Sequence, residues 1–172
     1  MDSGVQPDIV TMGKPMGAGH PLAVVVTTPP IAAAFARETH YFNTFGGNPV
    51  SAAAGNAVLD VVEQENLLAS VNRTGEHFLN GLRALGTKHS LIGDVRGKGL
   101  FIAVELVEDR LTKSPATVAA TAVVESLREQ GVLTALIGRD RNALKFRPPL
   151  VFNIEHADIA LEALDRALSA SV

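Results

Sequence analysis

The chain has 172 residues, of which 47% are hydrophobic, and a formal net charge of -3 at pH 7, which suffices for one packed core or parts of two. The sequence has no basic patch and no interleaved aromatic residues, so nucleic acid is not expected as a partner. The longest apolar run is far too short to span a membrane. The five histidines are scattered, so no metal site is expected. The absence of cysteine excludes disulfides, and the N-terminus lacks the pattern of a signal sequence, so we expect a cytoplasmic protein.

The first predicted element is a short apolar run at residues 9–12, which is typical of a buried strand. Gly13 and Lys14 end this strand, and a loop rich in glycine and proline follows up to Pro21. Desolvation at the mouth of a parallel strand turns a lysine into a neutral nucleophile that can form a Schiff base. The alternative is that Lys14 is an ordinary solvated loop lysine.

A second buried strand is predicted over residues 22–28, and the two prolines after it open a short helix over 31–36. A loop with a hydroxyl, two glycines and an Asn-Pro pair then leads into an alanine-rich helix over 52–65. A hydroxyl and free backbone N–H groups beside a helix N-terminus can receive an anion such as phosphate. The alternative for Asn43 and Thr44 is an ordinary loop and helix cap.

The rest of the chain predicts helices alternating with strands. Val118, Val123, Val124 and Leu127 form the expected apolar face of one of these helices, and Gly131 is its expected stop. The predicted elements are a helix over 66–85, a hairpin over 91–107, a helix over 116–130, strands over 132–137 and 143–150, and a last helix over 155–169.

Two cations lie two residues apart on the strand predicted over 143–150. Lys145 and Arg147 therefore project to the same side. A paired cationic face can hold a carboxylate or a phosphate. The alternative, a solvated edge strand, fits the sequence equally well. Arg96, in the predicted hairpin, is expected to have a structural role.

Three segments resemble the signatures of one enzyme family, in that family's order. Residues 7–14, Pro-Asp-Ile-Val-Thr-Met-Gly-Lys, followed by glycines and Pro21, resemble the Schiff-base lysine segment of the class III (omega) aminotransferases, which are pyridoxal 5'-phosphate (PLP) enzymes of fold type I. Residues 44–49, Thr-Phe-Gly-Gly-Asn-Pro, resemble the second signature of the family. Residues 95–97, Val-Arg-Gly, resemble the opening of its small domain.

The resemblance implies a site and a partner. Lys14 would be the Schiff-base lysine and the proton shuttle at the substrate carbon. Thr44, with Asn43 beside it, would contact the cofactor phosphate of the other subunit in a homodimer. Lys145 and Arg147 would bind a small-molecule amine substrate.

The resemblance also implies an α/β fold that is only the C-terminal part of a fold type I PLP enzyme. Residues 1–66 would end the sheet of the PLP-binding large domain, 67–90 would form an interdomain helix, and 91–172 would form a small α+β domain. The glycine-rich phosphate loop, the aromatic residue stacked on the pyridine and the aspartate at the pyridine nitrogen have no counterpart in this sequence. We therefore expect a piece of a longer protein.

One departure from the family pattern bears on the substrate. Class III transaminases carry an arginine that grips the substrate carboxylate where this chain has Lys145, and lysine lacks the bidentate fork. This departure, together with the amino-acid sequence of residues 12–21, resembles the branch of phospho-lyases that act on phosphoethanolamine and phosphorylated hydroxylysine. We expect elimination of phosphate from a phosphorylated amino alcohol; the alternatives are an omega-amino-acid transaminase and a non-catalytic truncated fragment.

Overall fold

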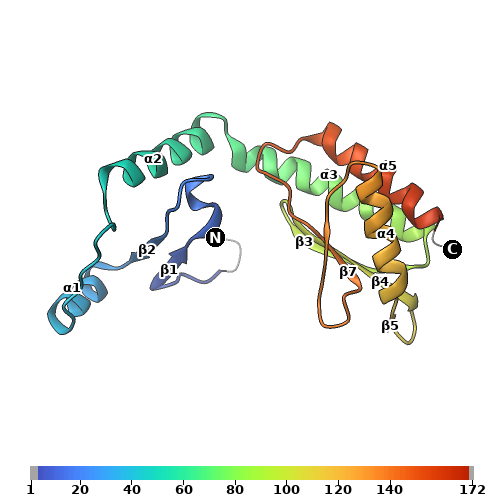
Figure 1. The fold of residues 1–172 in the computed structure, drawn as a ribbon, viewed down its shortest axis with the longest axis horizontal. Helices are drawn as coiled ribbons and strands as arrows, with labels where there is room; N and C mark the ends of the chain where they lie inside the picture. The colour runs from blue at the N-terminus through green and yellow to red at the C-terminus, as the bar shows by residue number, and fades with distance from the viewer. Residues whose placement is uncertain (1–3, 171–172) are drawn as a thin grey trace. The chain divides into compact units, whose positions relative to one another are not determined.

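The structure is a computed structural model that describes residues 4–170 and divides the chain into two compact units, Met1–Glu65 and Asn66–Val172 (Figure 1). Each unit is described by itself. The domain boundaries predicted for the whole enzyme stay a prediction. Among the described residues, no helix is both long enough and apolar enough to cross a membrane.

The first unit is a two-stranded ribbon with three helical segments. The strands β1 and β2 pair antiparallel, with Ile9 opposite Thr27. Two prolines begin α1, as expected. α2 begins at Pro49, three residues earlier than predicted, and Asn48 caps it. The elements are β1 (Ile9–Met12), the 3-10 helix η1 (Lys14–Gly17), β2 (Val24–Thr27), α1 (Pro29–Glu38) and α2 (Pro49–Gln64).

The prediction that both strands are buried is wrong for this structure. Ile9 is 55% exposed and Val25 is 66% exposed. Among the described residues of the first unit, only Gly17 and Gly55 are buried, so no layer of this unit covers either face of the ribbon. The pairing is also antiparallel, because β2 follows β1 through a short loop rather than a crossover.

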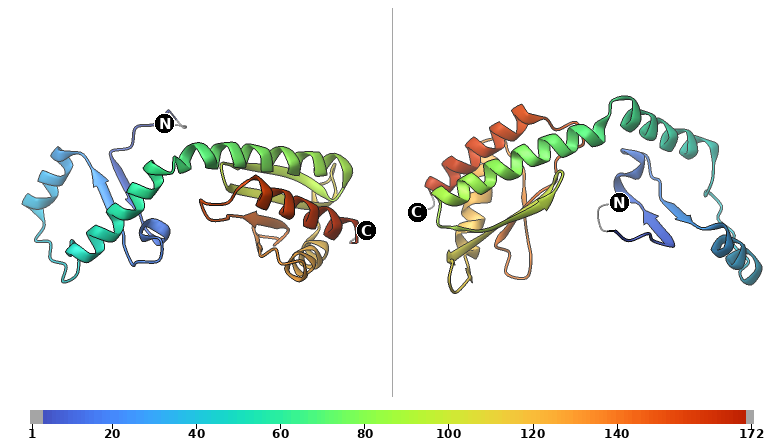
Figure 2. Two further views of the ribbon diagram at one scale, coloured as in Figure 1. Left: turned by 90° about the horizontal axis from the view of Figure 1, so that it is seen from above. Right: turned by 180° about the vertical axis from the view of Figure 1, so that it is seen from behind.

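The second unit is an antiparallel sheet covered on one face by three helices, as Figure 2 shows. The strand order is β3-β4-β7-β6, and β5 pairs antiparallel with the end of β4. The elements are α3 (Leu67–Lys88), β3 (Ile92–Lys98), β4 (Phe101–Asp109), β5 (Ser114–Pro115), α4 (Thr117–Glu129), β6 (Ala135–Ile137), β7 (Ala143–Phe146) and α5 (Ile154–Ser169).

The hydrophobic core lies between this sheet and its helices. The predicted alternation of the hairpin is confirmed, since Ile102, Val104 and Leu106 all point into the core. The Phe78 ring from α3 meets the Phe146 ring from β7 edge to face, at 5.3 Å between centroids. The other helices add buried side chains to the same cluster, among them Val123, Leu127, Leu164 and Leu168.

The predicted apolar face of α4 is wrong at one position. Val118 is 86% exposed. The buried face consists of Ala120, Val123 and Leu127, which follow helical spacing from one another and leave position 118 on the solvent side. Gly131 follows the helix with φ +82°, which confirms the expected stop.

A close backbone contact holds α3 against the β3–β4 turn. A side chain at Gly75, in the middle of α3, would collide with the carbonyl group of Gly99. Gly99 itself has φ +53° in that turn. The helix and the turn thus approach as closely as two backbones can.

Histidine–aspartate pairs join α3 to α5. Nε2 of His77 lies 2.6 Å from a carboxylate oxygen of Asp158. The carboxylate of Asp165 lies 2.7 Å from Nζ of Lys88 and 2.5 Å from Nε2 of the buried His89. The hydrogen bond from Lys88, followed by that from His89, holds the pKa of Asp165 below its usual range. These pairs lie along two helices that also share the core.

Candidate functional site

Lys14 directly follows β1, as predicted, but in an unusual backbone conformation. Its φ is +50°, in the left-handed region that side chains other than glycine rarely adopt. Ala18, which ends η1, is also left-handed, with φ +47°. Lys14 is exposed, so the described residues do not supply the expected desolvation. An L residue in this conformation costs about 1–2 kcal/mol.

The loop before α2 is organised by an asparagine. The Asn43 side-chain oxygen accepts hydrogen bonds from the backbone N–H groups of Phe45 at 3.1 Å and Gly46 at 2.8 Å. Its side-chain nitrogen donates to the Tyr41 hydroxyl at 3.1 Å. Asn43 therefore shapes the turn that presents Thr44, and its proposed contact with a cofactor stays a prediction.

Thr44 is exposed and is not the cap of α2. That role belongs to Asn48, whose side-chain oxygen accepts the backbone N–H of Ser51 at 2.9 Å. Since Pro49 has no N–H and the N–H of Ser51 is already used, the helix offers an anion fewer backbone donors than the sequence suggested. The Thr44 hydroxyl thus gains importance as a donor.

One contact in this unit was not predicted. Nε2 of His20, in the loop after Lys14, lies 2.8 Å from the Ser51 hydroxyl in the first turn of α2. It links the Lys14 loop to the helix that follows Thr44. The signal in the sequence was a histidine set between Gly19 and Pro21, inside the lysine signature.

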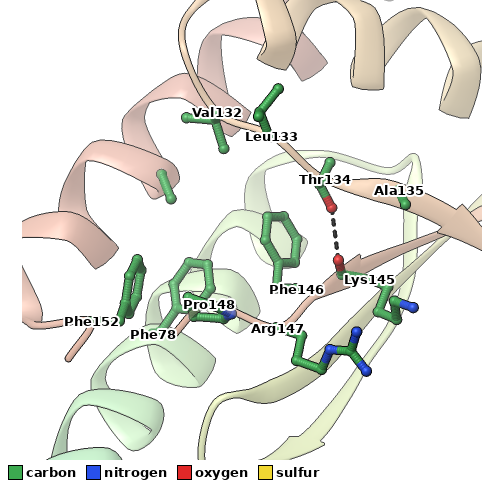
Figure 3. A pocket seen from close by; sticks show the side chains of 11 residues that line it. Phe78, Val132, Leu133, Thr134, Ala135, Lys145, Phe146, Arg147, Pro148 and Phe152 are labelled. Atoms are coloured by element: carbon green, nitrogen blue, oxygen red, sulfur yellow. Dashed lines mark hydrogen bonds between the residues drawn. The ribbon is translucent and has the colours of Figure 1, made fainter. Parts of the chain in front are cut away.

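The second unit brings Lys145 and Arg147 together. β7 ends at Phe146, so Arg147 follows the strand instead of lying within it as predicted, but Figure 3 shows both charged groups on the side opposite to the Phe146 ring, as predicted. Lys145 is half-buried and Arg147 is exposed. The residues opposite Lys145 on the neighbouring strands are Ala103 and Ala135, whose small side chains leave room around the ammonium group.

A cavity of about 380 Å³ lies beside this cationic pair. The Thr134 hydroxyl at its wall donates to the carbonyl of Lys145 at 2.8 Å, a bond drawn in Figure 3. The Phe146 ring lines this cavity, while the charged groups of Lys145 and Arg147 lie on the opposite side of the chain (Figure 3). The cavity is lined by Phe78, Val132, Leu133, Thr134, Ala135, Lys145, Phe146, Arg147, Pro148, Phe152 and Ala160.

Arg96 is neutralised within its own hairpin. Its guanidinium lies 2.5 Å from Asp94 and 2.7 Å from Glu105. The hydrogen bond to Asp94, followed by that to Glu105, raises the pKa of Arg96 further above its usual value. These pairs support the predicted structural role. Between residues 4 and 170, no cluster of three or more His, Asp or Glu side chains could hold a metal ion.

The lysine, the loop and the small unit together fit a family of known proteins. The family model for class III aminotransferases matches residues 1–168. The chain belongs to this family. Its mixed α/β fold matches the C-terminal part of class III aminotransferase structures, as predicted.

Relatives of this class III chain include both transaminases and phospho-lyases. It is 47% identical over 165 residues to alanine–glyoxylate aminotransferase 2 homolog 2, mitochondrial, of Arabidopsis thaliana. It is also 47% identical over 169 residues to ethanolamine-phosphate phospho-lyase homolog 1 of Caenorhabditis elegans. These matches cover 96% and 98% of this chain but 34% and 36% of the relatives, so the chain spans about a third of their length.

The solved structures that match this chain also include a phospholyase and a transaminase. A phospholyase from Arthrobacter in complex with phosphoethanolamine matches with a TM-score of 0.93 at 44% identity, over 97% of this chain and 40% of that one. An amine transaminase from an uncultivated Pseudomonas species, in the PLP-bound form, matches with a TM-score of 0.88 at 34% identity, over 98% and 40%. The chain is therefore homologous to PLP-dependent transaminases and phospho-lyases.

Proposed function

We propose that the protein carrying this class III chain uses PLP to eliminate phosphate from a phosphorylated amino alcohol such as phosphoethanolamine. The observation that carries the proposal is Lys145, which stands beside Arg147 and between two alanines where a transaminase would hold a carboxylate with arginine. A compact ammonium group is adequate for a phosphate, whereas a carboxylate favours a planar fork.

The residues of the first unit have the chemistry that PLP requires. Lys14 offers a primary amine for the aldehyde of the cofactor. Thr44 offers an exposed hydroxyl for the phosphate, in a turn held by Asn43 and next to the N-terminus of a helix. A side chain at Gly47 would meet no atom within 4 Å, so the loop between Thr44 and the helix is open at that position.

In this proposal Lys14 has two tasks, and Thr44 and the cationic pair have one each. PLP, when bound, supplies a sink for the electron pair left at the substrate carbon that carries nitrogen. Lys14 binds the cofactor and removes the proton from that carbon. Thr44 donates a hydrogen bond to the cofactor phosphate, and Lys145 with Arg147 binds the substrate phosphate, which leaves from the neighbouring carbon. Addition of water then yields an aldehyde and ammonia.

The experiment compares two reactions of the complete protein. We expect rapid release of inorganic phosphate from phosphoethanolamine and slow transfer of amino groups from gamma-aminobutyrate to a keto acid. Lys145→Arg should shift the preference toward the carboxylated amine. Lys113→Arg, at an exposed turn, is the matched control and should leave the preference unchanged.

Rapid amino transfer without phosphate release would establish an omega-amino-acid transaminase instead. A specific observation keeps that alternative in view, because Arg147 still offers one guanidinium fork on the same side as Lys145. Unchanged preference in Lys145→Arg would mean that Lys145 does not contact the substrate.

The proposal includes a homodimer in the cytoplasm in which Thr44 serves the cofactor of the partner subunit. Large aromatic side chains flank Thr44 and are exposed: Tyr41 by 66%, Phe42 by 78% and Phe45 by 80%. Exposed aromatic clusters of this kind are enriched where another protein surface binds. They support an interface at this loop.

A further inference from the structure

A chain of hydrogen bonds connects the loop after Lys14 to the loop that carries Thr44. It begins where Nε2 of His20 meets the Ser51 hydroxyl at 2.8 Å, between residues 31 positions apart in the sequence. The side-chain nitrogen of Asn48 donates to the same hydroxyl at 2.9 Å and to the carbonyl of Phe45 at 2.8 Å. The chain thus ends at the residue directly after Thr44.

The donors and acceptors of this chain are complementary. Because the Ser51 oxygen accepts from Asn48, its own proton needs an acceptor. Nε2 of a neutral His20 provides one when the ring proton is on Nδ1, a tautomer that we assign from this network. Each hydrogen bond then has one donor and one acceptor.

A second contact fixes the same two segments. A side chain at Gly55 would lie 2.8 Å from the Leu22 side chain, so α2 and the Lys14 loop meet closely there as well. Positions 51 and 55 lie one helical turn apart on one face of α2, and positions 20 and 22 both lie in the segment between η1 and β2. The contact between Gly55 and Leu22 sets the distance between the two segments, while the hydrogen bond between His20 and Ser51 sets their relative orientation.

We infer that His20 is a positioning residue, which acts through Ser51 and Asn48 to hold the Lys14 loop at a fixed place relative to the Thr44 loop. The inference rests on the proposed function, in which the two loops bind the aldehyde and the phosphate of PLP. It does not depend on whether Thr44 serves the cofactor of its own subunit or that of the partner, since the connection lies within one chain.

The test uses variants of the complete protein: His20→Ala, His20→Gln, Ser51→Ala and the double variant His20→Ala/Ser51→Ala. The readouts are the dissociation constant of PLP, the absorption maximum of bound PLP, and amide hydrogen exchange of residues 13–20 and 43–51 without cofactor. His20→Ala should weaken PLP binding roughly three- to tenfold, as expected for one lost hydrogen bond. Exchange should be faster in both segments.

Two comparisons separate positioning from general stability. Because the amide of glutamine reaches about as far as Nε2, His20→Gln should restore most of the binding, and the double variant should bind no more weakly than either single variant. His40→Ala, at an exposed histidine of the same unit, should change none of the readouts.

The inference is overturned if His20→Ala behaves like His40→Ala, or if the effects of His20→Ala and Ser51→Ala simply add. It is also overturned if exchange is faster throughout residues 4–65 with unchanged PLP binding and absorption, since His20 would then be merely structural. Failure of the proposed function is a separate result. If the protein did not bind PLP at Lys14, borohydride reduction of the unsubstituted protein would fail to label Lys14; if it were a transaminase, Lys14 would be labelled but no phosphate would be released. Hydrogen exchange without cofactor would decide the role of His20 in either case.

Discussion

At the scale of single residues, the backbone conformation of Lys14 allows its effect on stability to be tested apart from its proposed chemistry. Its φ of +50° favours glycine, yet the position holds a lysine. A second lysine, Lys113, has the same left-handed conformation, with φ +58°, in a turn outside the proposed site. The two positions thus form a natural pair in which the backbone is similar and only the proposed chemistry differs.

We predict that Lys14→Gly leaves the free energy of unfolding of the complete protein within about 1 kcal/mol of its original value, because relief of the left-handed backbone offsets the added chain entropy. The same substitution should abolish covalent attachment of PLP. Urea unfolding measures the first effect, and borohydride reduction with peptide mapping measures the second. Lys113→Gly should match it in stability but keep the label on Lys14; a label that persists in Lys14→Gly would contradict the assignment.

Thr44→Ala should weaken PLP binding by about 1–3 kcal/mol, the range for a lost charge-assisted hydrogen bond. Stability should change by less than about 0.5 kcal/mol, since Thr44 is exposed and Asn48 caps the helix. Mixing Thr44→Ala subunits with Lys14→Arg subunits tests whether Thr44 acts across the interface. Mixed dimers should recover one complete site, whereas no recovery would place Thr44 and Lys14 in the same subunit's site.

Lys14 and the Thr44 loop were singled out by their resemblance to family signatures, and their roles stay predictions, whereas the cationic pair followed from local spacing. The two-residue period put Lys145 and Arg147 on one side of the chain, and the structure confirms it. The His20–Ser51 bond could not be predicted, since it joins residues 31 positions apart. The cap of α2 could have been predicted, because Pro49 at the first helical position makes the preceding asparagine the cap.

At the scale of elements, α3 and α5 are joined by polar pairs as well as by the core. Asp165 is the central group, since it accepts from both Lys88 and the buried His89. A carboxylate whose folded pKa is lowered adds stability above its unfolded pKa of about 3.9. That contribution is lost as the pH falls through the folded pKa.

Asp165→Asn should therefore lower the free energy of unfolding by about 1 kcal/mol at pH 7, through weaker hydrogen bonds. The difference from the unsubstituted protein should shrink as the pH falls from about 4 through the lowered folded pKa of Asp165, below which the carboxylate is neutral in both states. Urea unfolding at several pH values measures this. Asp140→Asn, at an exposed turn, is the control; a pH-independent difference for Asp165→Asn would show that charge plays no part in joining the helices.

Burial of strands was the element property that the sequence predicted least well. An apolar run such as residues 9–12 indicates that something covers it, but not which part of a protein does so. In this structure the two strands of the first unit expose their side chains. The hairpin of the second unit, in contrast, meets three helices of its own chain, and its alternation was predicted correctly.

At the scale of the whole molecule, the two units differ in how they are stabilised. All buried hydrophobic side chains found among residues 4–170 lie in the second unit, from Leu67 to Leu168. The first unit buries two glycines within the same described range. Since burial of apolar surface is the largest driving force of folding, the second unit alone has the means to be independently stable.

We predict that residues 66–172, produced alone, unfold cooperatively in urea, and that residues 1–65 alone show no cooperative transition. Circular dichroism across a urea series measures both. In the protein of residues 66–172, Phe78→Ala should lower the free energy of unfolding by about 3–5 kcal/mol, because it empties a fully buried site. A sharp transition for residues 1–65 would show that the first unit is stabilised by something other than burial of its own side chains.

The close approach of α3 to the β3–β4 turn has a consequence for protein engineering. Glycine in the middle of a helix is about 1 kcal/mol less favourable than alanine, so a procedure that optimises each helix by itself would replace Gly75, one of three glycines in α3. That replacement would push a methyl group into the carbonyl of Gly99 and open the seam between helix and turn. A stabilised version of this unit must therefore keep Gly75 and be improved at other positions of α3.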